Sequence, residues 1–197
     1  MNKILNTQLT KQVIIGTKSK SRKNIFRSLS IKFNYRSANI DEKKVLNLKN
    51  NKNDALKIAI AKAKYLSSKY ENKIIITFDT TILFQRKTIY KCDTMKCCSK
   101  LLKLFGNKKH RLYTGMVFMI NNKIIQKKLT STDIMFKKNN INKINKYVKK
   151  NFSQIRSAVG CYNIESYGKD LFQNINKSYY NILGIDIINF LKMMRKV

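Results

Sequence analysis

The sequence predicts an α/β fold in which a single domain, residues 1–197, contains a mixed, elongated β-sheet flanked by helices. Segments with helical periodicity alternate along the chain with segments that favour strands, which argues against a β-sandwich or a helical bundle. The chain has 197 residues, of which 43% are hydrophobic, so it can bury a core without added cross-links. Neither an internal repeat nor a linker divides it.

The first predicted element is a short buried strand at residues 13–16, followed by a polar loop at residues 17–21. A helix is expected at about residues 23–29, and the alternation in residues 32–35 predicts a half-buried strand. A strand, loop and helix start in this order can bind phosphate through backbone N–H groups and a basic side chain, here Arg22. Most such turns bind nothing, so this signal is weak when taken alone.

The next helix is expected to be capped by Asp54 and to end near Ser68. Apolar residues at helical spacing define its buried face: Ala55, Ile58, Ala59, Ala63 and Leu66. Lys62 lies on that same face. A lysine in this position usually extends its ammonium group to solvent, and the sharper alternative is that Lys62 points into a phosphate site.

Residues 74–84 form a continuous β-favouring run, as expected for a central strand covered on both faces. Asp79 interrupts this run. A carboxylate is costly to bury unless it meets a metal, a cation or hydrogen-bond donors, so Asp79 is the most informative local irregularity. Two interpretations stay open: a functional carboxylate, or a structural carboxylate paired with a lysine.

The alternation of helices and strands continues to the end of the chain. The predicted elements are a turn at 85–87, a strand at 88–90, a helix from Met95 to Phe105 ending at Gly106, strands at 112–120 and 123–136 joined by a turn at Asn121 and Asn122, a helix containing Ile141, Ile144 and Val148, short strands at 158–164 and 171–175, and a helix at 186–194 that begins near Asp186.

The formal net charge of +32 makes nucleic-acid binding one interpretation of the sequence. The lysines are spread along the whole chain rather than gathered in one stripe, which favours a solvated basic surface and no specific nucleic-acid partner. Either way, the positive field attracts anions such as nucleotides. Apolar runs are far shorter than the ~20 residues of a membrane span, so we expect a cytoplasmic protein without a membrane partner.

The four cysteines, Cys92, Cys97, Cys98 and Cys161, match no zinc-binding spacing, and we expect them to be buried free thiols in a reducing compartment. The single histidine, His110, has no nucleophile motif beside it, and the chain contains neither a Walker loop nor a dinucleotide fingerprint. Metal-dependent phosphate chemistry must therefore draw on the ten acidic residues.

Several polar motifs, in order from about residue 13 to 191, resemble those of the Maf-like nucleoside triphosphate pyrophosphatases. The matching segments are Thr17-Lys18-Ser19-Lys20-Ser21-Arg22 for a Ser-x-Ser-Pro-x-Arg loop, Ile40-Asp41-Glu42, Ala61-Lys62-Ala63, Phe78-Asp79-Thr80, Ile89-Tyr90-Lys91-Cys92, the stretch from Asn107 to Gly115 with His110 and Thr114, residues 157–165, and residues 180–185. Residues 157–165 are similar to the form found in alphaproteobacterial members. The chain departs from the family pattern at Lys20 and Asp186, where members carry proline, and at Ser131, where many carry glutamate.

The resemblance implies a Maf/inosine triphosphatase-like fold with two lobes around a central cleft. It also implies hydrolysis of a canonical or modified nucleoside triphosphate to the monophosphate and pyrophosphate. Asp79 and Glu42 are then the expected catalytic residues and hold a divalent cation, Mg²⁺ or Mn²⁺, while Asp79 also orients or deprotonates the attacking water. Members of the family are often homodimers, although the sequence itself gives no dimer signal.

The expected contacts with the substrate come from Ser19, Arg22, Lys62, Thr80, Lys91 and Glu165. Within this set, Arg22, Lys62 and Lys91 would bind the phosphates, and Ser19 is expected to shape the loop rather than to react. Thr80 resembles members that prefer dTTP and UTP, whereas Glu165 resembles members that prefer 7-methyl-GTP. The preferred base therefore stays open.

Two alternatives to an active enzyme remain. One is a basic nucleic-acid-binding protein, and the other is a catalytically decayed Maf-like scaffold, as lost prolines and accumulated lysines would allow. The retention of Arg22, Glu42, Lys62, Asp79 and Lys91 argues against decay, because sequence drift had every opportunity to replace them.

Overall fold

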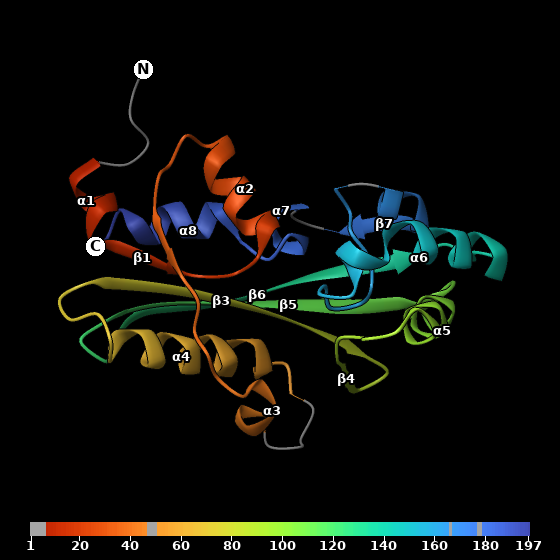
Figure 1. Cartoon of the computed structure of the whole chain (residues 1–197), viewed down its shortest axis with the longest axis horizontal. Coiled ribbons are helices and arrows are strands. Elements are labelled where there is room, and N and C mark those ends of the chain that lie inside the picture. Colours follow the sequence, from red (N-terminus) through yellow and green to blue (C-terminus); the bar gives the residue numbers. More distant parts are fainter. Residues whose placement is uncertain (1–6, 47–50, 166, 177–178) are drawn as a thin grey trace.

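The computed structural model describes residues 7–46, 51–165, 167–176 and 179–197 (Figure 1). Its strands are β1 (Val13–Gly16), β2 (Asn34–Arg36), β3 (Ile74–Phe84), β4 (Lys87–Ile89), β5 (Lys109–Ile120), β6 (Lys123–Phe136) and β7 (Phe172–Asn176). The helices are α1 (Thr7–Gln12), α2 (Lys20–Ser28), α3 (Glu42–Val45), α4 (Asp54–Ser67), α5 (Met95–Phe105), α6 (Ile141–Ile155), α7 (Tyr179–Ile182) and α8 (Ile187–Met194), with a 3₁₀ helix, η1, at Tyr167–Leu171.

The seven strands form a single mixed sheet in the order β2-β1-β3-β5-β6-β7, with β4 paired to β3. Strand β1 runs parallel to β2 and β3, and the other pairings are antiparallel. Helices cover both sides of this sheet: α4 lies on one side, and α2 and α8 lie on the other (Figure 1). The predicted α/β class with a mixed sheet flanked by helices is therefore confirmed.

Most elements lie where local sequence patterns predict them, and the turn between β5 and β6 is confirmed by the positive φ angles of Asn121 and Asn122, 46° and 61°. The strand expected at residues 158–164 is wrong. Gly160 and Cys161 have φ angles of 88° and 57°, which break an extended backbone and leave turns and bends. Asp54 is the first residue of α4 rather than its cap, which is Asn53.

The side chains of β3 alternate between two apolar clusters, as the period of a strand requires. Ile74, Ile76 and Phe78 pack with residues of α2 and α8 on one face of the sheet. Ile75 packs with residues of α4 on the other face. This covering on both faces explains why the sequence of β3 is apolar over nearly its whole length.

A separate core lies toward the other end of the sheet and includes residues of α5 and α6. Along β3, Phe78 belongs to the cluster packed with α2 and α8, called the first core from here on, and Ile82 belongs to the separate core, called the second core. Along β5 the same change occurs between Met116 and Leu112. The two cores correspond to the two expected lobes. Between the two cores, β3 and β5 each carry a polar stretch, and Asp79 lies in the stretch of β3. Within the described part of the chain, no helix is both long and apolar enough to cross a membrane.

Candidate active site

Asp79 lies in the polar break of β3 and is only 8% exposed. Its partner across the antiparallel ladder is Gly115 of β5. A Cβ atom at Gly115 would lie 2.6 Å from the Cα atom of Leu56 and 2.7 Å from the carbonyl oxygen of Ala55. The glycine therefore allows the first turn of α4 to pack directly against the sheet beside Asp79.

Lys62 of α4 reaches this carboxylate. Its Nζ donates to Oδ1 of Asp79 at 2.5 Å and lies 2.7 Å from Oε1 of Glu42, and its side chain is 15% exposed. A hydrogen bond of 2.6 Å from the hydroxyl of Thr77 to the carbonyl oxygen of Ala59 fixes the helix to β3. Of the two alternatives for Lys62, extension to solvent does not hold, because two carboxylates draw its ammonium group inward. Its role in phosphate binding stays a prediction.

Glu42 is the first residue of α3, and its position follows from the residue before it. Asp41 caps this short helix by accepting hydrogen bonds from the backbone N–H groups of Lys43 and Lys44 at 3.0 and 3.4 Å. Lys91, which follows β4, places its Nζ 3.9 Å from Oε2 of Glu42, and its side chain is 49% exposed. Lys91 thus lies at the solvent edge of the cluster formed by Glu42, Lys62 and Asp79.

Arg22 lies in the first turn of α2, the helix that covers the side of the sheet opposite to α4 (Figure 1). Its Nε donates to the carbonyl oxygen of Gly184 at 2.8 Å, and its Nη2 donates to Oγ1 of Thr80 at 2.9 Å. Gly184 has a φ of 92°, and a Cβ atom there would lie 2.7 Å from Nε of Arg22. Only glycine fits both this backbone conformation and the guanidinium group.

The loop between β1 and α2 is held by its own hydroxyl groups. Oγ1 of Thr17 accepts from the backbone N–H of Ser19 at 3.1 Å, and Oγ of Ser19 accepts from the backbone N–H of Arg22 at 3.3 Å. Ser19 is thus the N-cap of α2. These bonds agree with the expectation that Ser19 shapes the turn, and Thr17 takes part in it as well.

Glu165 lies beside this loop. Its Oε2 accepts a hydrogen bond of 2.6 Å from the hydroxyl of Ser21, and its backbone N–H donates to Oδ1 of Asn163. These contacts place Glu165 next to the N-terminal turn of α2. They give no support to a role for Glu165 as a metal ligand beside Asp79 and Glu42.

The two carboxylates of the cluster have opposite pKa shifts. Burial raises the pKa of Asp79 and outweighs the attraction of Lys62, and the negative charge of Glu42 raises it further. Partial burial also raises the pKa of Glu42, but Lys62, Lys91 and Arg22 together outweigh this effect and lower its net pKa. Burial lowers the pKa of Arg22, while Asp79 and Glu42 oppose that shift. Burial thus makes Asp79 more basic than an ordinary aspartate, while the cations make Glu42 less basic than an ordinary glutamate.

A polar network that sequence reasoning missed lies behind Thr80. The hydroxyl of Thr114 donates to the backbone carbonyl of Asn181 at 3.2 Å and lies 3.3 Å from the hydroxyl of Thr80. The side chain of Asn181, 2% exposed, also bonds Thr130 and Thr132 of β6 at 2.8 Å each. A signal for this network exists in the sequence, because Thr114 and Asn181 both fall within motifs that resemble the family. The motifs alone did not indicate that the two residues are in contact.

His110 belongs to the second core rather than to the carboxylate cluster. Its ring stacks on Phe105 with centroids 4.3 Å apart, and its Nε2 lies 3.0 Å from the hydroxyl oxygen of Tyr162. Burial lowers the pKa of His110 to about 3, so the imidazole stays neutral at ordinary pH. Its contacts indicate a packing role.

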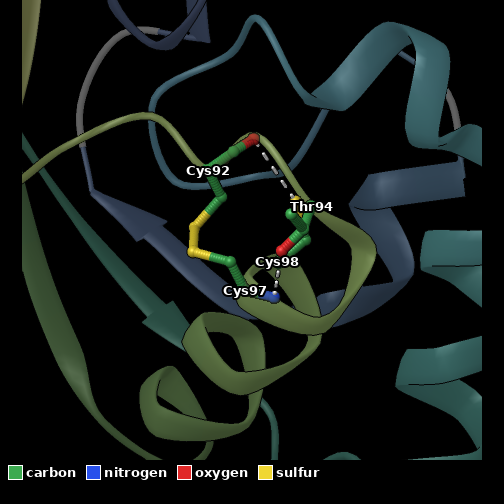
Figure 2. The surroundings of a disulfide bond; sticks show 4 residues. All are labelled: Cys92, Thr94, Cys97 and Cys98. Carbon is green, nitrogen blue, oxygen red and sulfur yellow. Dashed lines mark hydrogen bonds between the residues drawn. A yellow bond between two sulfur atoms is a disulfide. The ribbon is translucent and has the colours of Figure 1, made fainter.

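The expectation of four buried free thiols is wrong for two of the cysteines. A disulfide joins Cys92, which follows β4, to Cys97 in the first turn of α5 (Figure 2). The chain reverses between these elements, and this reversal brings the two residues together. Cys97 is exposed, whereas Cys98 and Cys161 are buried free thiols, as expected.

Comparison with known proteins agrees with the motifs. The chain is 30% identical over 187 residues to a dTTP/UTP pyrophosphatase of Clostridium botulinum, covering 93% of this chain and 97% of that protein. It is 23% identical over 194 residues to a 7-methyl-GTP pyrophosphatase of Rhizobium johnstonii, covering 96% and 98%, and 22% identical over 191 residues to a nucleoside triphosphate pyrophosphatase of a Ruegeria species, covering 94% and 96%. The sequence profile of Maf-like proteins matches residues 12–197, so the chain belongs to the Maf-like protein family.

Proposed function

We propose that this protein hydrolyses a nucleoside triphosphate between its α- and β-phosphates, releasing the monophosphate and pyrophosphate. The observation that carries the proposal is the cluster in which Lys62 is held between Glu42 and the buried Asp79. The relatives from Clostridium botulinum, Rhizobium johnstonii and a Ruegeria species are all named as pyrophosphatases that act on nucleoside triphosphates, which supports the proposal.

Cations from three segments would bind the polyphosphate. Arg22 lies in the first turn of α2, where backbone N–H groups add to the attraction for an anion. Lys62 is already oriented by two carboxylates, and Lys91 lies at the exposed edge. In the complex, Lys62 would exchange one carboxylate contact for a phosphate oxygen, which keeps its charge paired.

Asp79 would act as the general base. Its raised pKa makes it a stronger proton acceptor than an ordinary aspartate. The proton of a water would pass to Asp79 while the water oxygen bonds to the α-phosphorus. The bond from that phosphorus to the bridging oxygen then breaks, and pyrophosphate leaves with the bonding electrons.

The same cluster fits a divalent cation. Glu42 and Asp79 present oxygen atoms on either side of one ammonium group, so this point in the structure already attracts positive charge. Carboxylate oxygens are the ligands that Mg²⁺ and Mn²⁺ prefer. Glu42 and Asp79 would hold the ion, which would neutralise charge on the triphosphate when bound.

For the base, we propose a preference for dTTP and UTP over 7-methyl-GTP. Glu165 accepts a hydrogen bond from Ser21, which occupies one of its carboxylate oxygens. Relatives from Clostridium botulinum and Fusobacterium nucleatum, 30% and 27% identical, are named dTTP/UTP pyrophosphatases. Formation of a homodimer and the absence of a specific nucleic-acid partner stay predictions.

The test is a product assay on the full chain. The purified protein is incubated with dTTP, UTP, GTP, 7-methyl-GTP and ATP, each with Mg²⁺ or Mn²⁺, and ³¹P NMR distinguishes pyrophosphate plus monophosphate from phosphate plus diphosphate. We expect pyrophosphate as the phosphorus product, with the highest kcat/KM for dTTP or UTP. Release of inorganic phosphate, or no turnover of any of these nucleotides by folded protein, would contradict the proposed reaction.

A further inference from the structure

Three buried sulfur atoms meet at one point in the second core. The Sγ atoms of Cys92, Cys98 and Cys161 all lie within 4.8 Å of one another. They come from three separate segments: the chain after β4, the first turn of α5, and the turn that follows α6. Cys98 also lies close to the backbone of Cys92, with its Sγ 4.0 Å from the carbonyl oxygen (Figure 2).

We propose that the reduced protein binds one soft metal ion, such as Zn²⁺, through the thiolates of Cys92, Cys98 and Cys161, and that Cys97 controls access to this site. While the disulfide is closed, the sulfur of Cys92 is shared with Cys97 and the set of three ligands is incomplete. The inference is independent of the proposed hydrolysis, since it concerns other residues and another class of metal.

The geometry and the chemistry of the three sulfurs both fit this assignment. Zinc–sulfur bonds of about 2.3 Å in a tetrahedron require sulfur atoms about 3.8 Å apart, so the observed grouping needs only small side-chain movements. Thiolates select soft ions such as Zn²⁺ and Cu⁺, whereas Mg²⁺ and Mn²⁺ prefer oxygen. The thiol site and the Glu42–Asp79 site would therefore bind different metals.

Charge and burial explain why a metal, rather than free thiolates, suits this position. Cys92, Cys98 and Cys161 are all buried, and a free thiolate is costly to bury when no positive charge accompanies it. A divalent ion that displaces three protons leaves a single net negative charge. That charge lies beside the N-terminal turn of α5, whose dipole favours it.

Exposure determines how the disulfide opens. Cys97 is exposed and Cys92 is buried, so a thiolate of an external dithiol reductant would attack the sulfur of Cys97. The sulfur–sulfur bond breaks and Cys92 leaves as a thiolate next to Cys98 and Cys161. The second thiol of the reductant then displaces Cys97, so that one dithiol is oxidised to a disulfide and two cysteines are reduced.

Cobalt binding tests the proposal directly. The full chain is reduced with a phosphine, freed of reductant under nitrogen and titrated with Co²⁺, whose thiolate charge-transfer and visible bands report sulfur coordination. We expect one sulfur-coordinated Co²⁺ per reduced chain and no such bands from the oxidised chain. Cys161→Ser should weaken binding by at least about 100-fold, since losing even an outer-shell partner of a metal costs 10–100-fold. Glu42→Gln is the matched control and should leave these bands unchanged.

A further variant isolates the role of Cys97. Cys97→Ser cannot form the disulfide, so it should bind Co²⁺ without prior reduction. If the reduced wild-type chain binds Co²⁺ and the Cys97→Ser chain does not, Cys97 is a ligand and its assignment as the control element is wrong.

Because a serine variant can fail to fold, alkylation of the wild-type chain gives a second readout. Zn²⁺ should slow modification of Cys92, Cys98 and Cys161 in reduced protein, and equal rates with and without Zn²⁺ would overturn the site.

Discussion

Asp79 and Asp133 both lie on strands that pair with β5, but the residues opposite them differ. Gly115 faces Asp79, and the space that it leaves open is filled by α4. Arg111 faces Asp133 and donates two hydrogen bonds to it, at 2.5 and 3.0 Å, while Lys109 lies 3.0 Å away. One carboxylate is therefore enclosed by a helix, and the other lies in a basic pair at the surface.

The outcome for proton affinity is opposite. The hydrogen bond from Arg111 is the largest influence on Asp133 and lowers its pKa to about 2. Burial is the largest influence on Asp79 and raises its pKa although Lys62 is in contact. A neighbouring cation therefore does not by itself decide how basic a carboxylate is. Removal from water decides it here, and of the two only Asp79 suits proton transfer.

Replacing each carboxylate by its amide should change the rate of hydrolysis very differently at Asp79 and at Asp133. Asp79→Asn should lower kcat for pyrophosphate release by about 10²–10⁴-fold, the usual contribution of a general base. The melting temperature should change little, because the amide is nearly the same size. Asp133→Asn is the matched control and should keep kcat within about twofold of wild type, since P–O cleavage makes no use of a surface ion pair. Ordinary turnover by Asp79→Asn would remove Asp79 from the mechanism.

The next effect tests how Lys62 tunes Asp79. Lys62→Met should lower kcat/KM by about 10²-fold, as loss of one charge-stabilising donor does. Because Lys62 lowers the pKa of Asp79, its removal should move the acid limb of the pH–rate profile to higher pH. Lys64→Met, on the exposed side of the same helix, is the control and should leave the limb in place. An acid limb that stays in place in Lys62→Met would show that Asp79 is not the group that titrates.

A smaller effect concerns the packing that encloses Asp79. Gly115→Ala should lower the free energy of unfolding by about 1–3 kcal/mol, because the added methyl group meets the backbone of α4. Urea denaturation measures this change. Gly106→Ala provides the comparison, since its φ of −51° suits any residue and its nearest backbone contact is 3.1 Å. Equal stability of Gly115→Ala and wild type would mean that α4 moves aside freely.

The smallest effect is expected at the surface pair. A lowered pKa in the folded state contributes stability that is present above pH 3.8, the ordinary aspartate pKa, and is lost as the pH falls through about 2. Exposure limits the contribution, so Asp133→Asn should cost less than about 1 kcal/mol at neutral pH. The difference from wild type should vanish once the pH is below about 2. A difference that persists there would assign the effect to packing instead.

Local patterns were sufficient to predict most of the fold. The uninterrupted β-favouring run of β3 and the apolar spacing of α4 each lie within one segment, and both elements are found within a residue of the prediction. The strand expected at residues 158–164 failed because left-handed angles at Gly160 and Cys161 break an otherwise apolar run. The residue types alone do not indicate that Cys161 has a left-handed backbone conformation.

The site was less accessible to such reasoning because its parts are distant in sequence. The irregular carboxylate at Asp79 was evident, but the direction of Lys62 depends on Glu42 and Asp79 together, which only the tertiary structure brings into contact. The disulfide between Cys92 and Cys97 depends likewise on the path between β4 and α5. The network around Asn181 requires three strands and the segment of α7.

The long ladder between β3 and β5 has a mechanical consequence. The two strands are paired from Ile75 to Leu83, a stretch that passes through both cores. The two halves of the molecule therefore cannot rotate about a hinge between them without breaking backbone hydrogen bonds of this ladder. Any adjustment to a bound nucleotide must instead come from the periphery, and α3, four residues long and without a buried side chain, presents Glu42 there. Asp79 is therefore fixed in a long, paired strand, whereas Glu42 is carried by a short helix that adjusts more easily.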